Sequence, residues 1–319
     1  MKLVVKTDEV VALEDAERAL LEQVPARLVE RACATEEAIV DQAREADGIL
    51  TLDEPFTAAV IERLDSCRVI SRFGIGVDRV DVDAATRKGI VVTNVPDYCV
   101  DEVSDHALAF LLAFARRLPW LDAAVRAGRW DTAAVAGDVR RLRGQVLGIV
   151  GFGRLGRRLA EKAAALGLQV VAHDPFVPSD DLRAAGVEPV PLDELLARSD
   201  WISLHVPLTH ATRHLIDTAA LEKVKPTAVL INTARGALID QAALVDALRE
   251  QRLGGAALDV LEREPPAADD PILALDNVLL TSHAAFNSVE ALAQMRRAAV
   301  ENVVRVLSDR PPLHAVNRL

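Results

Sequence analysis

Short apolar runs alternate with longer stretches of helical periodicity in the first third of the chain. The apolar runs predict strands, and the stretches between them, at residues 14–24, 57–64 and 82–88, predict helices. Such alternation is typical of a parallel sheet covered by helices. The predicted strands, which form one compact α/β unit ending near Pro96, are residues 3–5, 48–51, 69–72 and 89–93.

The same pattern continues in the rest of the chain. Residues 101–118 predict a long amphipathic helix that Pro119 ends, and residues 120–143 are less regular. Further strands are predicted at residues 145–150, 169–173, 201–206, 228–233, 255–260 and 278–282. A last helix, residues 288–307, is long enough to return to the first unit. We therefore expect a substrate domain of residues 1–100 with 289–319, and a nucleotide-binding domain of residues 101–288.

Composition narrows the functional class. Half of the residues are hydrophobic but only 3% are aromatic, which predicts a large aliphatic core. The net charge of -11 argues against nucleic-acid binding, although a small anionic substrate needs only a local positive site. No apolar run is long enough for a membrane span or a secretory signal. Cys33, Cys67 and Cys99 have no zinc or redox spacing, and Asp101 and Glu102 suit a helix start, so we expect a cytoplasmic protein without a metal.

The sequence GFGRLG at residues 151–156 follows an apolar strand pattern and opens a helical one, which is the context of a dinucleotide-binding loop. Gly151 permits the tight turn, Gly153 lets the backbone approach a pyrophosphate, and Gly156 lets the helix pack closely on the strand. The helix that begins at Arg154 and Leu155 offers free N–H groups to the phosphates. Because enzymes that use S-adenosylmethionine also carry glycine-rich turns, the loop alone does not select the cofactor.

Asp174 ends the second predicted strand of this domain, eighteen residues after Gly156. A carboxylate at this position accepts hydrogen bonds from the ribose hydroxyls of NAD and repels the additional phosphate of NADP. The alternative is an ordinary surface turn, because the sequence Asp174-Pro175 is common in turns. Its spacing from the glycine loop favours NAD.

Three residues follow apolar runs of this domain and carry the chemistry of an acid–base site. Arg235, Glu264 and His283 come after separate predicted strands, and the carboxyl ends of parallel strands share one edge of a sheet. His283 suits the exchange of a hydroxyl proton because histidine titrates near neutrality. Glu264 suits the other ring nitrogen, and Arg235 suits a two-pronged contact with a carboxylate. Each of these residues, considered alone, is best interpreted as an ordinary surface group. The three together indicate the oxidation of a 2-hydroxy acid.

With these segments in view, the chain resembles the D-isomer-specific 2-hydroxyacid dehydrogenases over essentially its whole length. The resemblance rests on residues 73–78 (FGIGVD), 94–96 (NVP), 151–156, 205–209 (HVPLT), 232–236 (NTARG) and 256–260 (AALDV), with Glu264, Pro265 and His283. It implies two doubly wound α/β domains, a Rossmann NAD-binding domain inserted in a flavodoxin-like substrate domain. It also implies the catalytic roles given above to Arg235, Glu264 and His283.

The resemblance implies further site residues. Gly76 and Val77 present backbone N–H groups to the substrate carboxylate, and Thr233, Ala234 and Asp259 lie along the nicotinamide. His205 lies in one of the motifs, but we interpret it as structural because a second catalytic histidine has no task here. The implied substrate-binding set is Arg72, Gly74, Ile75, Gly76 and Val77. The implied cofactor-binding set is Gly151, Gly153, Arg154, Leu155, Gly156, Asp174, His205, Val206, Pro207, Thr233, Ala234 and Asp259.

The branch of the family stays open. Arg72 with residues 74–78 and 84–90 is similar to D-3-phosphoglycerate dehydrogenases, where Arg72 would help to bind an anionic substrate. Residues 94–99 are closer to bacterial relatives of the C-terminal-binding proteins, so an NAD-sensing binding protein is the alternative to an enzyme. Glu264 argues against formate dehydrogenases, which carry Gln there. Residues 120–143 resemble the family's dimerisation arm, and the alternative is a loop that packs on its own subunit. Tyr98 and Cys99 either influence the choice of substrate or only pack in the interior.

Overall fold

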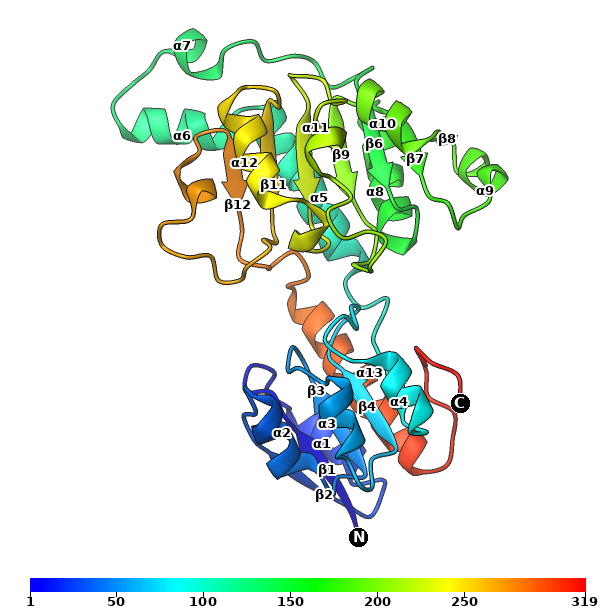
Figure 1. The fold of residues 1–319 in the computed structure, drawn as a ribbon. Helices are drawn as coiled ribbons and strands as arrows, with labels where there is room; N and C mark the ends of the chain where they lie inside the picture. Colours follow the sequence, from blue (N-terminus) through cyan, green and yellow to red (C-terminus); the bar gives the residue numbers. More distant parts are fainter. The chain divides into compact units, whose positions relative to one another are not determined.

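The computed structural model describes residues 1–319 and divides into two compact units. The first consists of Met1–Tyr98 with Ser288–Leu319, and the second of Cys99–Asn287. Each unit contains its own parallel β-sheet with helices on both faces (Figure 1). The two-sheet α/β architecture predicted from the sequence is therefore confirmed. None of the helices combines the length and the apolar character that a membrane span requires.

The sheet of the first unit has the strand order β2-β1-β3-β4-β5. All its strand pairs are parallel, and Val5 of β1 pairs with Val29 on one side and Ile49 on the other. This is the flavodoxin-like order, as the resemblance implied. The strands are β1 (Lys2–Lys6), β2 (Ala26–Glu30), β3 (Gly48–Thr51), β4 (Val69–Arg72) and β5 (Val91–Thr93).

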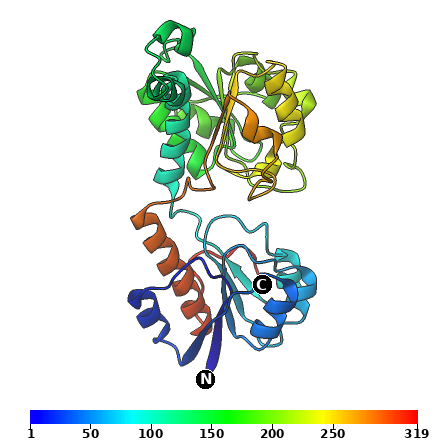
Figure 2. The same ribbon diagram turned by 90° about the vertical axis from the view of Figure 1, so that its left-hand side faces the viewer.

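Helices from both ends of the chain cover this sheet. One face carries α1 (Asp15–Leu21) and α13 (Val289–Leu307), and the other carries α2 (Glu36–Ala43), α3 (Ala58–Glu62) and α4 (Val82–Arg87) (Figure 2). Side chains of Ile39, Ile49, Ile61 and Ile70 are fully buried in the aliphatic core beneath α2 and α3. Their burial fixes the carboxyl ends of β3 and β4, where the candidate substrate loop begins.

The sheet of the second unit has seven strands in the order β12-β11-β10-β9-β6-β7-β8. From β8 to β11 this is the Rossmann order 3-2-1-4-5-6, with β12 as a seventh parallel strand. The strands are β6 (Val146–Val150), β7 (Gln169–His173), β8 (Glu188–Pro189), β9 (Trp201–Leu204), β10 (Val229–Asn232), β11 (Gly255–Leu258) and β12 (Val278–Leu280).

Two apolar cores hold helices on the faces of this larger sheet. On one face, Phe110 and Phe114 of α5 (Val100–Ala115) and Leu159 of α8 (Arg154–Ala165) pack on the strands. On the other, Leu195 and Leu244 join the core that also contains α11 (Thr218–Leu221). Further elements of this unit are α9 (Ser179–Ala184), α10 (Leu192–Arg198), α12 (Gln241–Arg249) and the short 3-10 helices η1 (Gly236–Leu238) and η2 (Pro271–Ala274).

The segment around Pro119 differs from the prediction. α5 ends at Ala115, before the proline, and Arg117 adopts a left-handed conformation with φ 55°. Pro119 then lies in the first turn of a new helix, α6 (Leu118–Arg126), where proline costs no backbone hydrogen bond. A further short helix, α7 (Thr132–Ala136), follows within the stretch predicted to be less regular.

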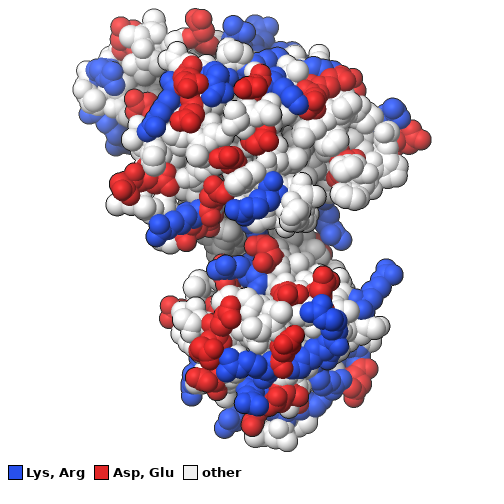
Figure 3. All heavy atoms as spheres, viewed as in Figure 1, with Lys and Arg blue, Asp and Glu red and all other residues white.

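Charged side chains of both signs intermingle over the visible face of each unit (Figure 3). Most of their ion pairs are exposed, such as Arg44 with Asp65 and Arg63 with Glu37. Exposed pairs of this kind contribute little to stability because water screens them. We therefore attribute the stability of both units mainly to their aliphatic cores.

Candidate active site

The glycine loop joins β6 to α8, and two of its glycines are required by the backbone. Gly151 has φ 95°, and a Cβ added there would lie 2.7 Å from the carbonyl group of His205. A Cβ on Gly156 would lie 2.2 Å from the carbonyl oxygen of Gly151, because the helix packs directly on the turn. A Cβ on Gly153, by contrast, would meet nothing within 4 Å. The loop thus leaves open space at the start of α8, as a phosphate cradle requires.

Asp174, directly after β7, fastens the glycine loop. One of its carboxylate oxygens accepts a hydrogen bond from the Phe152 N–H at 2.8 Å, and the other accepts one from the Phe176 N–H at 2.9 Å. The hydrogen bond from Phe176 forms a local turn at Asp174, which is the alternative interpretation that the sequence left open. Because a carboxylate has about four acceptor positions, ribose hydroxyls can still bind beside these two donors.

Two buried polar atoms lie at the carboxyl ends of β9 and β10. The Nδ1 atom of His205, after β9, and the hydroxyl oxygen of Thr233, after β10, have no hydrogen-bond partner within the protein. Burial lowers the pKa of His205 to about 4, so its ring is neutral near pH 7. Its Nε2 atom lies 2.8 Å from the Ser203 hydroxyl. A bound ligand can supply the hydrogen bonds that the His205 Nδ1 atom and the Thr233 hydroxyl lack. Together with the open glycine loop, these residues fit a bound dinucleotide.

The other residues of the predicted cofactor set lie on the same loops. Arg154 is exposed and Leu155 half-buried in the first turn of α8. After β9, Val206 is half-buried and Pro207 exposed, and a methyl group of Val206 would lie 2.8 Å from a Cβ on Gly151. Their contact with a cofactor stays a prediction.

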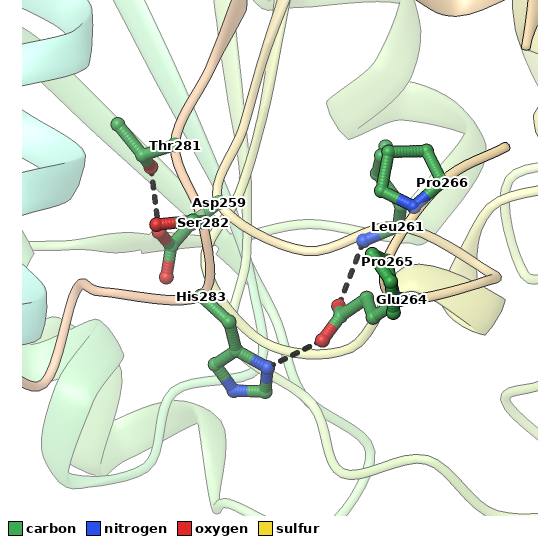
Figure 4. Close-up of a pocket in the computed structure, with 8 residues that line it drawn as sticks. All are labelled: Asp259, Leu261, Glu264, Pro265, Pro266, Thr281, Ser282 and His283. Atoms are coloured by element: carbon green, nitrogen blue, oxygen red, sulfur yellow. Dashed lines mark hydrogen bonds and ion pairs between the residues drawn. The ribbon is translucent and has the colours of Figure 1, made fainter. Parts of the chain in front are cut away.

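His283 and Glu264 form a hydrogen-bonded pair at the carboxyl end of the sheet. The His283 Nδ1 atom lies 2.7 Å from one carboxylate oxygen of Glu264, and the other oxygen accepts the Leu261 N–H at 2.9 Å (Figure 4). The hydrogen bond that the Glu264 carboxylate accepts raises the pKa of His283 above its usual value. Burial and the positive charge of Arg235 lower this pKa and are outweighed. The pair lines a pocket with Pro265, among other residues.

Asp259 holds the turn that carries His283. Its buried carboxylate accepts a hydrogen bond from the Thr281 hydroxyl at 2.5 Å (Figure 4). It also accepts hydrogen bonds from the N–H groups of Ala284 and Ala285 at 2.8 and 2.9 Å. Its backbone carbonyl accepts the His283 N–H at 2.7 Å. His283 itself has φ 54°, an unusual conformation for a side-chain-bearing residue that these bonds maintain. A contact between Asp259 and the nicotinamide stays a prediction.

Arg235 follows β10 on a turn that Asn232 organises. The buried Asn232 amide donates to the Arg235 carbonyl at 2.8 Å and accepts from the Ala234 N–H at 3.0 Å. A Cβ on the next residue, Gly236, would lie 1.9 Å from the backbone of Leu261. The Arg235 turn therefore packs directly on the loop between β11 and Glu264, and this brings the Arg235 charge close enough to influence His283.

In the first unit, the predicted substrate loop follows β4. Gly74 has φ 128°, and its carbonyl accepts the Val95 N–H at 2.9 Å. The Asn94 side chain donates to the Ile75 carbonyl at 2.7 Å. Gly76 and Val77 are half-buried. The segment after β5 therefore holds the first half of the substrate loop, at Gly74 and Ile75. The sequence identified residues 94–96 only as a motif and did not predict this contact.

Arg72 lies almost fully buried beside this loop. Its guanidinium donates to the Leu52 carbonyl at 2.9 Å and forms an ion pair with Asp53 at 2.8 Å. Tyr98 and Cys99 are also buried. The sequence singled out Arg72 for substrate binding but gave no sign that Asp53 neutralises it.

Asn94, Asn232, Gly236 and Thr281 hold these turns in place, a role that the sequence motifs alone do not reveal. Each acts through a contact with a segment distant in the chain or with the backbone of a turn. The available signals were that Asn94, Asn232 and Gly236 lie in the motifs quoted above and that Thr281 lies two residues before His283. Such offsets do not reveal which atoms meet.

Comparisons with known proteins match this geometry. A sequence profile described as "D-isomer specific 2-hydroxyacid dehydrogenase, NAD binding domain" matches residues 108–285. The glyoxylate reductase of Korarchaeum cryptofilum is 39% identical over 290 residues, which are 89% of this chain and 86% of that protein. The D-3-phosphoglycerate dehydrogenase of Methanocaldococcus jannaschii is 39% identical over 285 residues, 89% of this chain but only 54% of that longer protein.

Solved structures extend the similarity to the whole chain. The D-lactate dehydrogenase of Aquifex aeolicus, complexed with NAD and lactic acid, is 28% identical and superposes with a TM-score of 0.87 over 99% of each chain. The matched profile covers more than half of this chain, and the sequence relatives cover most of it. The chain therefore belongs to the D-isomer specific 2-hydroxyacid dehydrogenases, a family of NAD-binding dehydrogenases and reductases.

Proposed function

We propose that this protein interconverts a D-2-hydroxy acid and its 2-oxo acid by NAD-dependent hydride transfer. The observation that carries the proposal is the His283–Glu264 hydrogen bond, with the Arg235 turn packed on the same loop. A histidine held by a carboxylate, next to an arginine, is the set that proton exchange at the hydroxyl group of an anionic substrate needs. The bound nicotinamide cofactor supplies the hydride acceptor for oxidation and the hydride donor for reduction.

His283 serves as the acid–base group. Glu264 engages Nδ1, so Nε2 is the nitrogen left to exchange a proton with the substrate. In oxidation, Nε2 accepts the hydroxyl proton as the carbon–hydrogen bond breaks with its electron pair. In reduction, Nε2 donates that proton to the carbonyl oxygen. The carboxylate of Glu264 fixes the ring tautomer and stabilises the imidazolium form.

Arg235 binds the substrate carboxylate and polarises the carbonyl group. Its planar guanidinium matches a carboxylate with two parallel hydrogen bonds, a geometry that lysine cannot supply. In the first unit, the backbone N–H groups of Gly76 and Val77 are the proposed contacts for a substrate carboxylate. This assignment is supported by the family membership and by the firm attachment of the Gly74–Ile75 backbone through Val95 and Asn94.

NAD rather than NADP is the proposed cofactor. Asp174 stands at the end of β7 and orients the glycine loop through the Phe152 N–H. Its negative charge favours ribose hydroxyls and repels a phosphate on the ribose.

We also propose a cytoplasmic homodimer. The exposed Leu118, Val125 and Trp130, on and just after α6, lie in the segment that resembles a dimerisation arm and support this assembly.

An NAD-sensing binding protein with little turnover is the second candidate, favoured by the similarity of residues 94–99 to relatives of the C-terminal-binding proteins. A panel of 2-oxo acids with NADH separates the two. We expect NADH oxidation with at least one of glyoxylate, pyruvate, hydroxypyruvate and 2-oxoglutarate. Tight NADH binding without turnover on any acid, and without oxidation of 3-phosphoglycerate in reverse, would favour the sensor.

A further inference from the structure

The ion pair of Arg72 and Asp53 joins a buried cation to an exposed anion. The Arg72 side chain is 8% exposed, whereas that of Asp53 is 61% exposed. Arg72 also donates through Nε to the Leu52 carbonyl at 2.9 Å. Two sides of the guanidinium are therefore occupied by the loop that follows β3, and its charge is balanced by one carboxylate.

The third side of the guanidinium lies against the predicted substrate loop. A Cβ on Gly74 would lie 2.4 Å from the Arg72 Nη1 atom, so the guanidinium occupies the space that a side chain would take. Gly76 follows two residues later, and two residues span at most about 7 Å. A substrate whose carboxylate binds Gly76 and Val77 can thus direct a second group toward Arg72.

The remaining charges near this loop do not favour a second anion. Glu54, in the same turn as Asp53, is held by the Thr51 hydroxyl at 2.6 Å and the Leu52 N–H at 2.9 Å. Arg79 is exposed, and its Nε donates to the backbone carbonyl of Asp53 at 3.1 Å. Water screens the charge of such an exposed side chain. Arg72 is therefore the buried cation that a substrate phosphate would need, and its guanidinium is already paired with the Asp53 carboxylate.

We propose that Asp53 determines the charge class of the substrate: by neutralising Arg72, it selects 2-oxo acids that carry one carboxylate and an uncharged remainder. Acids with a phosphate or a second carboxylate are disfavoured, because they meet a balanced ion pair instead of a free guanidinium. The proposal rests on the function proposed above. It distinguishes this chain from a D-3-phosphoglycerate dehydrogenase, although Arg72 is present.

The test compares substrates with and without a second anionic group. Values of kcat/KM with NADH are measured for glyoxylate, pyruvate and hydroxypyruvate, and for 3-phosphohydroxypyruvate and oxaloacetate. We expect the native protein to prefer the first group. D53N removes the charge but keeps the size of the side chain, so it leaves Arg72 as a buried cation without a counterion. The preference should then shift by about tenfold toward the doubly anionic acids, mainly through KM.

E54Q is the matched control, because it removes the same charge from the same turn without touching Arg72. We expect it to change the preference less than about twofold. The double variant D53N/R72M should lose the gain of D53N. Thermal melting of each variant verifies that it is folded, and we expect D53N to melt at a lower temperature because it leaves the buried Arg72 without a counterion.

Binding is measured separately from turnover, by calorimetric titration of D-glycerate and 3-phosphoglycerate in the presence of NADH. Tighter binding of D-glycerate by the native protein, reversed toward 3-phosphoglycerate in D53N, supports charge selection even if no acid is turned over, and only the proposed catalysis would then fail. Native preference for the phosphorylated ligand overturns the selection by Asp53. An unchanged preference in D53N, or an equal shift in E54Q, overturns it as well.

Discussion

The Nδ1 atom of His283 lies 2.7 Å from a carboxylate oxygen of Glu264, and the other oxygen of that carboxylate is held by the Leu261 N–H. Glu264 is thus fixed by backbone before it acts on the imidazole. The hydrogen bond raises the pKa of His283, which keeps the ring protonated to a higher pH than an ordinary histidine. A proton donor for 2-oxo acid reduction benefits directly from this shift.

The first prediction concerns the pH dependence of reduction. Reduction needs the protonated imidazole, so kcat/KM should fall as pH rises through the pKa of His283. E264Q removes the negative charge that raises this pKa, and the alkaline fall should therefore move to lower pH, with a loss of roughly tenfold in rate at its optimum. Steady-state rates from pH 5 to 10 measure the profile. An alkaline limb at the same pH in E264Q would show that another group sets it.

The second prediction separates two glycines of the loop. G156A places a methyl group 2.2 Å from the Gly151 carbonyl oxygen, so it should cost about 1–3 kcal/mol of folding free energy. G153A meets no protein atom within 4 Å, so it should fold with a stability within about 1 kcal/mol of the native protein. Its methyl group would occupy the phosphate space, and NADH should bind about tenfold more weakly.

Denaturant unfolding and NADH fluorescence titration measure both effects. G153A serves as the control for the stability loss of G156A, because each adds one methyl group to the same loop. If G153A bound NADH as tightly as the native protein, the open space at the start of α8 would not be the phosphate site.

Most of the fold could be predicted from the sequence because buried parallel strands are continuous apolar runs. β2 and α2 were missed for a physical reason. β2 is an edge strand that carries Arg27 and Glu30 among its apolar residues, and α2 is short and begins with two acids. Pro119 was misinterpreted because proline both follows helices and begins them, and only the left-handed turn at Arg117 distinguishes the two.

The candidate site divides in the same way. His283, Glu264 and Arg235 could be identified because each follows a strand at one sheet edge and carries a side chain with evident chemistry. The contacts that fix them could not: the Gly236 approach to Leu261 and the Thr281 bond to Asp259 join loops of different strands. The Asp53–Arg72 ion pair likewise depends on how two adjacent strand ends meet, since β3 and β4 pair in register.

The third prediction concerns cofactor choice. The native protein should use NADH at least about tenfold more efficiently than NADPH, because Asp174 repels a phosphate on the ribose. D174N removes this charge and should bring the two efficiencies closer together. D180N, which removes an exposed carboxylate in α9, is the control and should leave the ratio unchanged. The ratio of kcat/KM for the two cofactors measures this, and equal efficiencies in the native protein would contradict the role of Asp174.

The central claim is hydride transfer with His283 as the acid–base group, and H283A tests it most directly. NADH oxidation with the best 2-oxo acid of the panel is measured for the native protein, for H283A and for H210A, which removes an exposed histidine after β9. We expect H283A to lose at least about a hundredfold in kcat while its Kd for NADH stays within about twofold, and H210A to behave as the native protein. Native-like turnover in H283A would contradict the account.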